Sequence, residues 1–506
     1  MAAYVRLMGG LVVQLDVPLP RELSVGAGTA LFVCGTCFHL GQRIRSLSFD
    51  VDGRRQPVRA HGMPRLDLFR SLHPGLDPYA TGGVSFDPAS PIDPYLHSYR
   101  SGFWGVAELP PSASELRLSA ELADGSTVGA PLASLTARHD PDPIEAAVRG
   151  PGAGPPVAIC MASYEPPIDL FRRQLDSIRA QTHANWVCII SDDCSSPARL
   201  AEMREVVGDD PRFVLSPSER RLGFYLNFER ALSMAPRDAL YVALADQDDV
   251  WYPEKLETLV GRVRDAKLVY SDARVIDRDG GVTSDTYWVS RHQNHDALEA
   301  LLVTNSVTGA ASLFSREVLD YALPFPPAQF AHFHDHWVAL VALALGRIEF
   351  VDRPLYDYVQ HGDATLGHAT ANWMPPLRSR LRSLTRNPRE RVVAWRFHYF
   401  VDACRLMVWA TIIRMRCGDR MDAGKRRSLD RFLSTDDSLL ALADMWRRGV
   451  LELLGRSRTL GGEWMLAYAF TWHRLLGASV RDRPARHLRL DALPPAALVN
   501  PPRKTR

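Results

Sequence analysis

Three aspartates stand within four positions at the end of a short apolar run. The run, Tyr241 to Ala245, is typical of a buried strand, and Asp246, Asp248 and Asp249 follow it directly. Carboxylates this close repel one another unless a cation joins them. A hard divalent ion with oxygen ligands suits such a cluster and commonly serves phosphate chemistry. The cluster therefore predicts a metal site, with a plain acidic turn as the alternative.

A second polar cluster, HFHDH, covers residues 332 to 336. His332 and His336 have the i, i+4 spacing of a zinc-binding helix, but the glutamate of the HExxH motif is missing. We therefore expect these two histidines to be surface groups or to lie behind a functional site. Asp335 comes just before an apolar segment that predicts a helix from Trp337, and an aspartate in that position often caps a helix.

Alternating strands and helices position these clusters. The predicted elements are a strand at 157–161, a helix from about 166, strands at 186–190 and 213–215, a helix at 224–234, the strand at 241–245 and a helix from 253. This order indicates an α/β fold with a mostly parallel sheet and a ligand site at the carboxyl ends of the strands. Ser163, Asp192–Asp193 and the Asp246 cluster all follow strands, so we expect them to line one crevice.

The flanking sequence has a different texture. Residues 1–140 contain short, partly alternating runs separated by Gly, Pro and Asp-Gly turns, which predict an N-terminal β-sandwich domain. Residues 141–156 are rich in Pro and Gly and predict a linker. Residues 157–370 form the predicted α/β domain, and residues 371–506 are predicted to be a basic α-helical region with a Pro-rich tail.

The charge of the chain is unevenly distributed. The 506 residues carry a net charge of +2, but residues 371–506 hold 27 Lys+Arg against 12 Asp+Glu, which leaves 33 against 46 for the rest. A basic region on an acidic body predicts contact with a polyanion or an anionic membrane surface. A bundle packed on the α/β domain and a subunit interface in a homo-oligomer are the alternatives. No recognition motif accompanies the charge, so we expect no nucleic acid partner.

Cysteine usage and hydropathy predict a cytoplasmic protein, free or held at the inner face of the cell membrane. The seven cysteines are scattered, and Cys34 and Cys37 have CxxC spacing without a second pair, so we expect two ordinary buried thiols. We find no convincing signal peptide. The best apolar stretch, Leu406 to Ile413, is bounded by two arginines and is far shorter than the about 20 residues that a membrane span needs.

Several longer stretches resemble a known family. They are VAICMASYEPP, LDSIRAQTHANWVCIISDDCSS, RRLGFYLNFERALSMAPRDALYVALADQDDVWYPEKLE, TGAASLFSREVLDYALPFP and FHDHWVALVALALGRIEFVDRPLYDYVQHGD. In order and spacing they resemble the inverting glycosyltransferases of family 2, which have the GT-A fold, over about residues 157 to 366. The closest likeness is to bacterial rhamnosyltransferase-type members that build surface polysaccharides. A sandwich before this fold and helices after it also resemble the multidomain galactofuranosyltransferases.

The resemblance implies roles for the polar clusters. Asp246 and Asp248 match the DxD motif of the family, with Asp248 as the direct metal ligand and Asp246 shared between metal and ribose. His361 matches a histidine that completes the coordination of Mn²⁺ or Mg²⁺. Asp335 falls where the family has its catalytic base. In such a site the metal neutralises charge on the leaving diphosphate, and the base takes the proton from the attacking hydroxyl.

The resemblance also implies contacts to donor and acceptor. The expected nucleotide-sugar contacts are Ala162, Ser163, Tyr164, Glu165, Asp192, Asp193, Arg221, Gly223, Asn227, Asp246 and Gln247, and the expected acceptor-side residues are Trp251, Gly309, His334 and Trp337. Asp193, with Asp192 as the alternative, is expected to accept a hydrogen bond from the base, and Arg221 to meet phosphate. Two positions depart from the family: Glu165 replaces a usual Asn, and Cys194 replaces a common Gly.

These features together predict an inverting, metal-dependent glycosyltransferase. Its expected donor is a nucleotide sugar, with dTDP-L-rhamnose as the first candidate and a UDP-sugar, as in galactofuranosyltransferases, as the alternative. Its expected acceptor is a growing cell-surface polysaccharide or a polyprenyl-linked glycan. A glycan-binding or scaffolding protein with an inactive transferase domain is the alternative from another class. Trp104, in the GFWG stretch, supports that alternative if it is exposed to sugars, and a buried core position is the other interpretation.

Two related enzyme classes fit less well. A nucleotidyltransferase needs a Gly-rich basic signature after the first strand, and MASYEPP contains no Gly. A processive polysaccharide synthase needs a QxxRW motif and membrane spans, and we find neither. The oligomeric state stays open at this stage.

Overall fold

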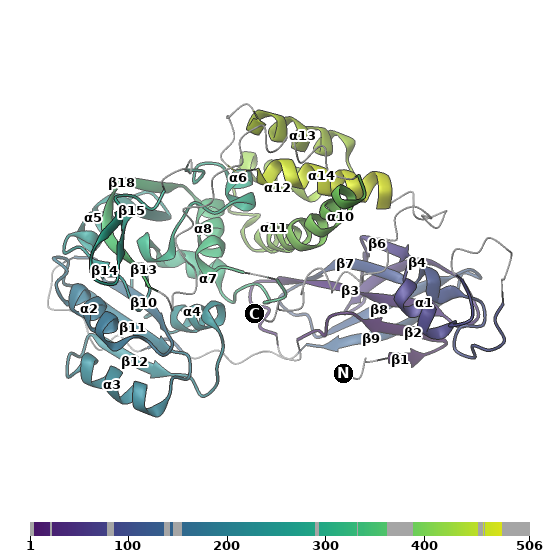
Figure 1. Ribbon diagram of the computed structural model, residues 1–506, viewed down its shortest axis with the longest axis horizontal. Coiled ribbons are helices and arrows are strands. Elements are labelled where there is room, and N and C mark those ends of the chain that lie inside the picture. The colour runs from purple at the N-terminus through teal and green to yellow at the C-terminus, as the bar shows by residue number, and fades with distance from the viewer. Residues whose placement is uncertain are drawn as a thin grey trace.

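The computed structural model describes residues 5–20, 23–77, 86–135, 142–144, 154–288, 293–330, 332–361, 388–453, 459 and 461–477. Figure 1 shows three parts: antiparallel sheets formed by the N-terminal residues, an α/β part that follows them, and helices that lie against both. The linker expected at 141–156 falls largely outside the described residues, as do the boundary expected at 370 and the Pro-rich basic tail.

Two antiparallel sheets form the N-terminal part. One has the order β1-β2-β3-β7-β6, and the other has the order β5-β4-β8-β9. Their strands are β1 Val5–Met8, β2 Leu11–Leu15, β3 Thr29–His39, β4 Ile44–Val51, β5 Arg54–Pro57, β6 Ala60–Met63, β7 Gly102–Leu109, β8 Glu115–Leu122 and β9 Thr127–Ser134. Alternate apolar residues of both sheets share one core, for example Val33 and Phe103 with Phe49 and Leu118, so the sheets pack face to face.

The opposite face of β3 and β7 packs against the rest of the chain. Cys34 and Cys37 are both buried free thiols, as expected, but Cys34 belongs to the core shared with the C-terminal helices and Cys37 to the core between the sheets. Trp104 is fully buried, and its ring packs edge-on against Tyr399 and Phe400. The interpretation of Trp104 as a core residue is therefore confirmed, and the GFWG stretch offers no exposed ring to a sugar.

The central sheet of the α/β part is mixed. Its order is β12-β11-β10-β13-β17-β15-β18-β14, with β16 beside β15. The strands are β10 Val157–Ser163, β11 Trp186–Asp192, β12 Phe213–Pro217, β13 Tyr241–Ala245, β14 Val250–Trp251, β15 Leu268–Asp277, β16 Val282–Ser284, β17 Ser312–Ser315 and β18 Ile348–Gln360. Pairing is parallel from β12 to β13 and between β15 and β18, and antiparallel elsewhere.

The expected mostly parallel sheet is therefore correct only for the first half. β17 runs antiparallel to both neighbours, β13 and β15. A buried apolar run looks the same in either direction, because both faces of a central strand need apolar side chains. The sequence pattern predicted β10 to β13 at the right places, but it predicted neither β14 to β18 nor the antiparallel orientation of β17.

Helices pack on the sheet, and those that begin at residues 168, 224, 255 and 334 correspond to the helices that the sequence predicted. The helices are α2 Ile168–Arg179, α3 Pro197–Val207, α4 Phe224–Ser233, α5 Lys255–Val263, α6 Leu298–Val303, α7 Leu319–Ala322 and α8 His334–Leu345. In α2, Phe171, Leu175 and Ile178 are buried on one face, as the apolar spacing predicts. The elements predicted from 157 to 263 are confirmed, most of them within two residues at each end.

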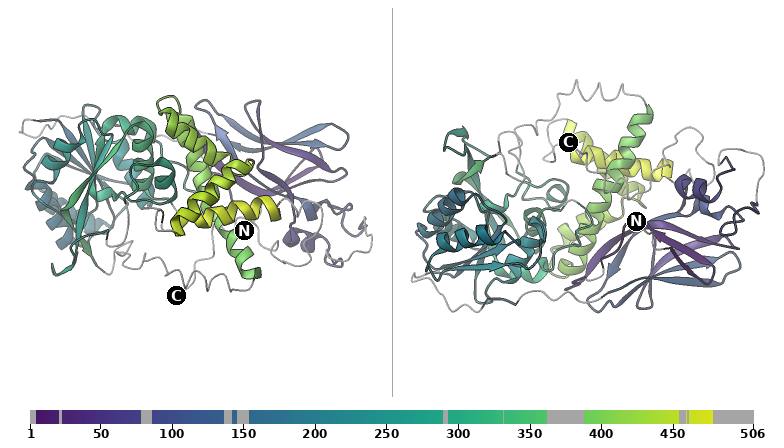
Figure 2. Two further views of the ribbon diagram at one scale, coloured as in Figure 1. Left: turned by 90° about the horizontal axis from the view of Figure 1, so that it is seen from above. Right: turned by 60° about the horizontal axis from the view of Figure 1, so that its bottom comes forward.

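The described part of the C-terminal region is helical, as expected. It consists of α10 Pro388–His398, a π-helical turn at Tyr399–Ala403, α11 Cys404–Cys417, α12 Ala423–Leu433, α13 Leu439–Leu453, α14 Gly462–Thr471 and a last turn at Trp472–Gly477. The two views of Figure 2 show these helices between the N-terminal sheets and the α/β part. Among the helices described, none has the length and apolar character needed to cross a membrane.

α11 joins the three parts. Its stretch from Leu406 to Ile413 is buried throughout, and Thr411 is the polar residue within it. Arg416, also buried, donates from Nε to the Gly28 carbonyl at 2.6 Å and from a terminal nitrogen to the Pro324 carbonyl at 2.7 Å. One guanidinium thus bridges the N-terminal sheets and the α/β part, so part of the basic charge of this region serves packing.

Candidate active site

The predicted metal ligands lie together at one edge of the central sheet. Asp246 and Asp248 follow β13, and His361 follows the last residue of β18. His361 Nε2 lies 2.8 Å from Asp248 Oδ2, although the two residues are far apart in the sequence. The His361 side chain is 5% exposed and that of Asp248 is 19% exposed, so the contact is shielded from solvent. The fold therefore joins two of the three expected ligands directly.

The ionised forms of the carboxylates in this cluster are destabilised by burial and by their negative neighbours. Burial and the nearby carboxylates of Asp248 and Asp335 raise the pKa of Asp246 to about 7. Burial also raises the pKa of Asp248, although its contact with His361 acts in the opposite direction. Asp249 is almost fully buried, and burial with the two neighbouring aspartates raises its pKa well above the usual value. Negative charge is thus concentrated here beyond what the surrounding protein compensates.

Lys255 is a buried cation beneath this cluster that the sequence analysis missed. Its side chain is fully buried, and Nζ donates to the Ala310 carbonyl at 2.5 Å and lies 3.6 Å from the centre of the Trp251 ring. Its charge lowers the pKa of Asp246 and of Asp249, while burial lowers its own pKa well below the usual value. In the sequence, this lysine stands beside the apolar positions of a helix that begins just after the Asp cluster. That position could have indicated that its side chain is buried.

Asp335 lies in the first turn of α8, and its charge reaches Asp246. The N-cap of α8 is Phe333, so Asp335 does not cap the helix, and the helix begins three residues earlier than expected. The carboxylate accepts the His336 N–H at 2.6 Å and also has hydrogen bonds from the Gly309 backbone and the Asn305 side chain. Burial outweighs these bonds and raises the pKa of Asp335 to about 6. Such a carboxylate is ionised at neutral pH and is a stronger base than an exposed aspartate.

Gly309 leaves room for His334 and Asp335, because it has no side chain. A Cβ atom at position 309 would lie 2.9 Å from His334 Nε2 and 3.3 Å from the Asp335 Cβ. The His334 ring stacks on Phe228 with 3.6 Å between ring centres, and burial lowers the pKa of His334 to about 3. His334 is therefore neutral near pH 7 and supplies shape rather than charge.

The residues present fit a divalent metal in part. In the described part of the chain, no three His, Cys, Asp or Glu side chains are grouped closely enough to hold an ion by themselves. Asp248 and His361 nevertheless provide adjacent oxygen and nitrogen donors, and no described residue donates a hydrogen bond to the Asp246 carboxylate. A site with few protein ligands suits Mg²⁺ or Mn²⁺, which take further oxygens from water and from substrate phosphates.

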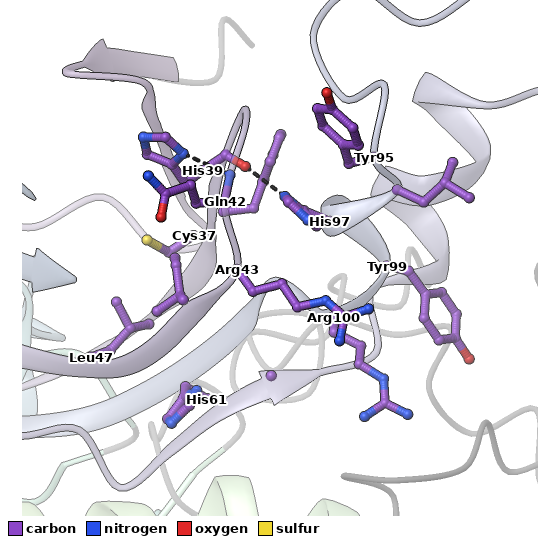
Figure 3. A pocket seen from close by; sticks show the side chains of 14 residues that line it. Cys37, His39, Gln42, Arg43, Leu47, His61, Tyr95, His97, Tyr99 and Arg100 are labelled. Carbon is purple, nitrogen blue, oxygen red and sulfur yellow. Dashed lines mark hydrogen bonds between the residues drawn. The ribbon is translucent and has the colours of Figure 1, made fainter. Parts of the chain in front are cut away.

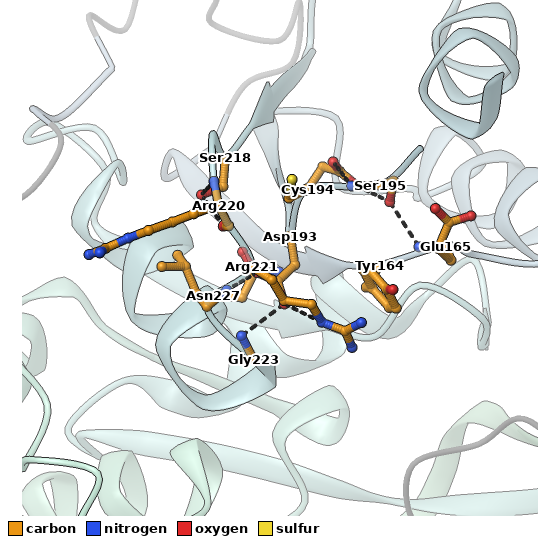
Figure 4. Close-up of polar contacts among 12 residues, drawn as sticks. Tyr164, Glu165, Asp193, Cys194, Ser195, Ser218, Arg220, Arg221, Gly223 and Asn227 are labelled. Carbon is orange, nitrogen blue, oxygen red and sulfur yellow. Dashed lines mark hydrogen bonds and ion pairs between the residues drawn. The ribbon is translucent and has the colours of Figure 1, made fainter. Parts of the chain in front are cut away.

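The expected nucleotide contacts surround the ends of β10 and β11. Figure 4 shows Asp193 facing the turn before α4. Its carboxylate accepts the N–H groups of Leu222 at 2.5 Å and Gly223 at 2.9 Å, and it is nearly fully buried. Arg221 lies over the Tyr164 ring, 3.3 Å from its centre, and its Nε is 3.6 Å from Asp193. Arg221 and Tyr164 are the more exposed members, so they form the accessible surface of this corner.

Other residues among the expected nucleotide contacts form hydrogen bonds within the protein. Asp192 accepts both the Oγ–H and the N–H of Ser195, at 2.5 and 2.9 Å. Asn227 donates to the carbonyls of Ser163 and Ser191 and accepts from the Ser191 hydroxyl. Arg230, which the sequence analysis missed, donates to that same hydroxyl. These side chains hold the strand ends in place, which is a positioning role.

The loop after β10 is fixed by neighbouring loops. Gln247 accepts the Tyr164 N–H at 2.8 Å, which links the ends of β10 and β13. Ala162 is half-buried in this strand, and the buried Ser163 hydroxyl has no hydrogen-bond partner among the described residues.

The two departures from the family fall at unusual backbone conformations. Glu165 has φ +42° and Cys194 has φ +64°, a region that favours Gly and, among other residues, Asn. The resemblance implies Asn and Gly at these two positions, and both residue types tolerate such a backbone conformation. Glu165 compensates in part, because its carboxylate accepts the Ser196 N–H at 2.5 Å at the start of α3.

Two of the expected acceptor-side residues are core residues in the structure. Trp337 is fully buried and donates from its indole to the Ala322 carbonyl at 2.9 Å. Trp251 is 2% exposed and covers Lys255. His332 and His336 are also buried, at 4% exposure each, so neither is a surface group, and the alternative that they lie behind a functional site stays a prediction.

The comparisons with known proteins identify one family. Residues 158–322 match the family described as Glycosyl transferase family 2. The uncharacterized protein y4gI of Sinorhizobium fredii is 31% identical over 139 residues, which are 27% of this chain and 15% of that protein. The uncharacterized glycosyltransferase alr2836 of Nostoc is 24% identical over 201 residues, 38% of this chain and 60% of that protein. The chain thus spans less than two thirds of the length of these curated relatives.

Solved structures give a weaker likeness. TarS of Staphylococcus aureus in complex with UDP-GlcNAc has 14% identity and a TM-score of 0.40, covering 64% of this chain and 91% of the other. The mannosyltransferase PcManGT of Pyrobaculum calidifontis, in complex with GDP-Man and Mn²⁺, has 16% identity and a TM-score of 0.34, covering 66% and 91%. At such scores the likeness carries no argument about ligands.

Proposed function

Residues 158–322 form a glycosyltransferase family 2 domain, and from this premise we propose that the whole protein is an inverting, metal-dependent glycosyltransferase. It transfers a sugar from a nucleotide donor to a hydroxyl of a glycan acceptor. The observation that carries the proposal is the meeting of Asp248 and His361 at 2.8 Å beside Asp246, whose pKa is raised in part by Asp335. A cluster of carboxylates that lacks compensating charge suits a site that receives a cation and a diphosphate.

The proposed reaction is a single displacement. Asp335 accepts the proton of the acceptor hydroxyl while that oxygen forms a bond to the anomeric carbon of the donor sugar. The bond from the anomeric carbon to the diphosphate oxygen breaks, and the nucleoside diphosphate leaves with the electron pair. Attack from the face opposite the leaving group inverts the anomeric carbon, and one base is sufficient because no enzyme nucleophile takes part.

The other residues position the reactants. Asp246, Asp248 and His361 would hold Mn²⁺ or Mg²⁺, which supplies positive charge to the diphosphate as it leaves. Tyr164 and Arg221 provide an aromatic face and a guanidinium at the nucleotide corner, and Ser163 is the buried end of β10 behind them. Gly309 and His334 shape the space next to Asp335. Trp251 and Trp337 have no place in this proposal because both rings are buried.

The donor and acceptor are proposed by class. The likeness of the quoted motifs to rhamnosyltransferase-type members makes dTDP-L-rhamnose the first donor to test, with UDP-sugars as the second. The acceptor is a growing surface polysaccharide or a polyprenyl-linked glycan. The basic helices are proposed to contact an anionic membrane that carries such an acceptor, at the inner face of the cell membrane. A homo-oligomer through the same helices is the alternative use of that surface.

The decisive test is donor turnover by the purified full-length protein. A panel of nucleotide sugars, with Mn²⁺, with Mg²⁺ and with chelator, is scored for release of nucleoside diphosphate. We expect metal-dependent release with one donor class and its loss in Asp248→Ala, while the exposed Asp265→Ala serves as matched control. Absence of turnover with every donor, together with retained glycan binding, would favour the scaffold alternative instead.

A further inference from the structure

A pocket lies in the N-terminal sheets, away from the acidic cluster. It has a volume of about 710 Å³ and is lined by the end of β3, the loop before β4, and the segment from Tyr95 to Arg100 (Figure 3). The near end of β3 touches the α/β part, where Gln329 hydrogen-bonds to the Phe32 backbone. From Phe32 to Cys37 the strand advances about 17 Å, at roughly 3.3 Å per residue. The pocket is therefore separate from the proposed transfer site, and its volume suits a small ligand.

Tyr95 and His97 line this pocket, and Phe86, which is not a lining residue, packs beside Tyr95. Tyr95 is 49% exposed and Phe86 is 51% exposed, and their ring centres lie 5.5 Å apart. The His97 ring stacks beside Tyr95 at 5.9 Å and an angle of 27°. Exposed rings grouped in this way leave apolar surface in water. A sugar ring presents an apolar face that covers such rings, while its hydroxyls remain hydrogen-bonded.

The charged residues that line the pocket are all cationic. Arg43 and Arg100 are exposed, and neither guanidinium pairs with a carboxylate of a described residue. The lining includes no Asp or Glu. Gln42 is tied to Asp124 outside the pocket, through a bond of 2.8 Å. Two unpaired guanidinium groups on one small cavity favour an anion, because arginine forms paired hydrogen bonds to carboxylate and phosphate.

The segment that carries these side chains is held rigidly. His73 is fully buried, with its ring nitrogens 2.7 Å from Asp87 and 3.0 Å from Asp93. Asp93 also accepts the N–H groups of the next residues along the segment, His97 and Ser98. Leu96, between the aromatic and cationic residues, has φ +59°, which is rare for a bulky side chain. Backbone strain persists where surrounding bonds enforce it and is concentrated at ligand sites.

We propose that this pocket binds an anionic sugar unit of the acceptor glycan, with the sugar ring on Tyr95 and its carboxylate or phosphate on Arg43 and Arg100. The inference rests on the proposed function, because it assumes that the acceptor is a glycan. Binding a remote unit of the acceptor raises the effective concentration of its reacting end at the transfer site. Long acceptors then benefit, whereas the donor and short acceptors do not.

The test measures binding of defined oligosaccharides to the full-length protein by calorimetry. The probes are tetragalacturonate, neutral maltotetraose, and the monomers galacturonate and glucose 6-phosphate, which separate carboxylate from phosphate. We expect at least tenfold tighter binding of an anionic probe than of maltotetraose. Arg43→Gln with Arg100→Gln should weaken that binding at least tenfold, whereas Arg55→Gln, on exposed β5, should leave it unchanged.

A matched pair of substitutions at Tyr95 tests the stacking of the sugar ring. Tyr95→Phe keeps the ring and should retain binding within twofold, whereas Tyr95→Leu should weaken it about fivefold, in line with the about 1 kcal/mol of an aromatic contact. Preference for galacturonate assigns a uronic acid, and preference for glucose 6-phosphate assigns a phosphorylated sugar. Failure of both anionic classes to bind, equal binding of maltotetraose, or binding that survives the double arginine change would overturn the proposal. Donor turnover, measured on the same variants, reports separately on the transferase function.

Discussion

Two pairs of aspartates stand at the ends of strands that both pair with β10. Asp192 and Asp193 are at the end of β11, and Asp246 and Asp248 are at the end of β13. The two pairs differ in how the surrounding protein stabilises their charge. Backbone and side-chain donors within 3 Å satisfy the first pair. The second pair has raised pKa values.

This contrast separates carboxylates whose charge is stabilised by hydrogen bonds from carboxylates that we propose to bind a metal. Hydrogen bonds to an ionised group stabilise its charge, so the Asp192 pair contributes to the structure of the loops. Buried carboxylates with few donors cost free energy until a cation arrives. The Asp246 cluster therefore stores an unfavourable charge that a bound metal would relieve. Substitutions in the two groups should separate activity from stability.

The largest effect is expected for Asp248→Ala. Loss of a metal ligand should reduce kcat by about 10³-fold, since charge stabilisation by a metal contributes several kcal/mol and about 1.4 kcal/mol corresponds to tenfold. The melting temperature should not fall, because a carboxylate with a raised pKa is removed. Activity and thermal unfolding are measured in parallel with Asp265→Ala. Activity within tenfold of wild type would contradict the metal assignment.

Asp335→Asn should have the next largest effect. The amide has nearly the same shape but cannot accept the proton, so kcat should fall roughly 10²- to 10³-fold. The raised pKa of Asp335 means that the folded state favours its neutral form, so the neutral amide should be at least as stable above pH 6. A variant that unfolds at lower temperature at pH 8, rather than higher or equal, would point to a structural role for the carboxylate.

The pH dependence tests the same residue without mutation. A base with a pKa of about 6 must be ionised to act, so kcat/KM should rise about tenfold per pH unit up to pH 6 and level off above it. An exposed aspartate would instead give a flat profile from pH 5 upward. The profile is measured at saturating metal, so that the metal ligands remain ionised. A flat profile across pH 5 to 7 would remove Asp335 from the role of base.

The residue patterns located both acidic groups, but only the family resemblance gave them different roles. Polar residues directly after apolar runs predict strand ends; the end of β13 was predicted correctly, whereas β10 and β11 each continue two residues further, through Ser163 and Asp192. Whether a carboxylate is satisfied depends on what folds over it. Asp193 is bound by Leu222 and Gly223, and Asp248 meets His361, and neither partner is visible from local spacing.

Burial was the other property that local sequence did not determine. Trp251 and Trp337 are aromatic residues near catalytic motifs, but tertiary packing encloses both. Lys255 is the opposite case, because a lysine is almost always exposed unless a partner compensates it, here Ala310 and the aspartates. The pocket of the N-terminal sheets is lined by residues from three separate segments, so no local motif predicts it.

Asp192→Ala should show the reverse of Asp248→Ala. It leaves the N–H and Oγ–H of Ser195 without their buried acceptor, which should cost about 2 kcal/mol and lower the melting temperature by roughly 4–8 °C. Activity of the folded fraction should remain within about tenfold of wild type. Chemical unfolding, with the exposed Asp209→Ala as control, provides the measurement. An unchanged unfolding free energy would show that Asp192, too, is held for a ligand.

The smallest effect is expected at Cys194, beside the satisfied pair. Its φ of +64° costs roughly 1–2 kcal/mol for a residue with a Cβ atom, and Gly removes that cost while adding about 0.5–1 kcal/mol of chain entropy. Cys194→Gly should therefore stabilise the protein by up to about 1 kcal/mol. Cys194→Ala keeps the Cβ and loses the same thiol contact to Glu219, so it should not stabilise. Equal unfolding free energies for the two variants would show that the loop does not strain this position, and that the common Gly of the family serves the ligand rather than the backbone.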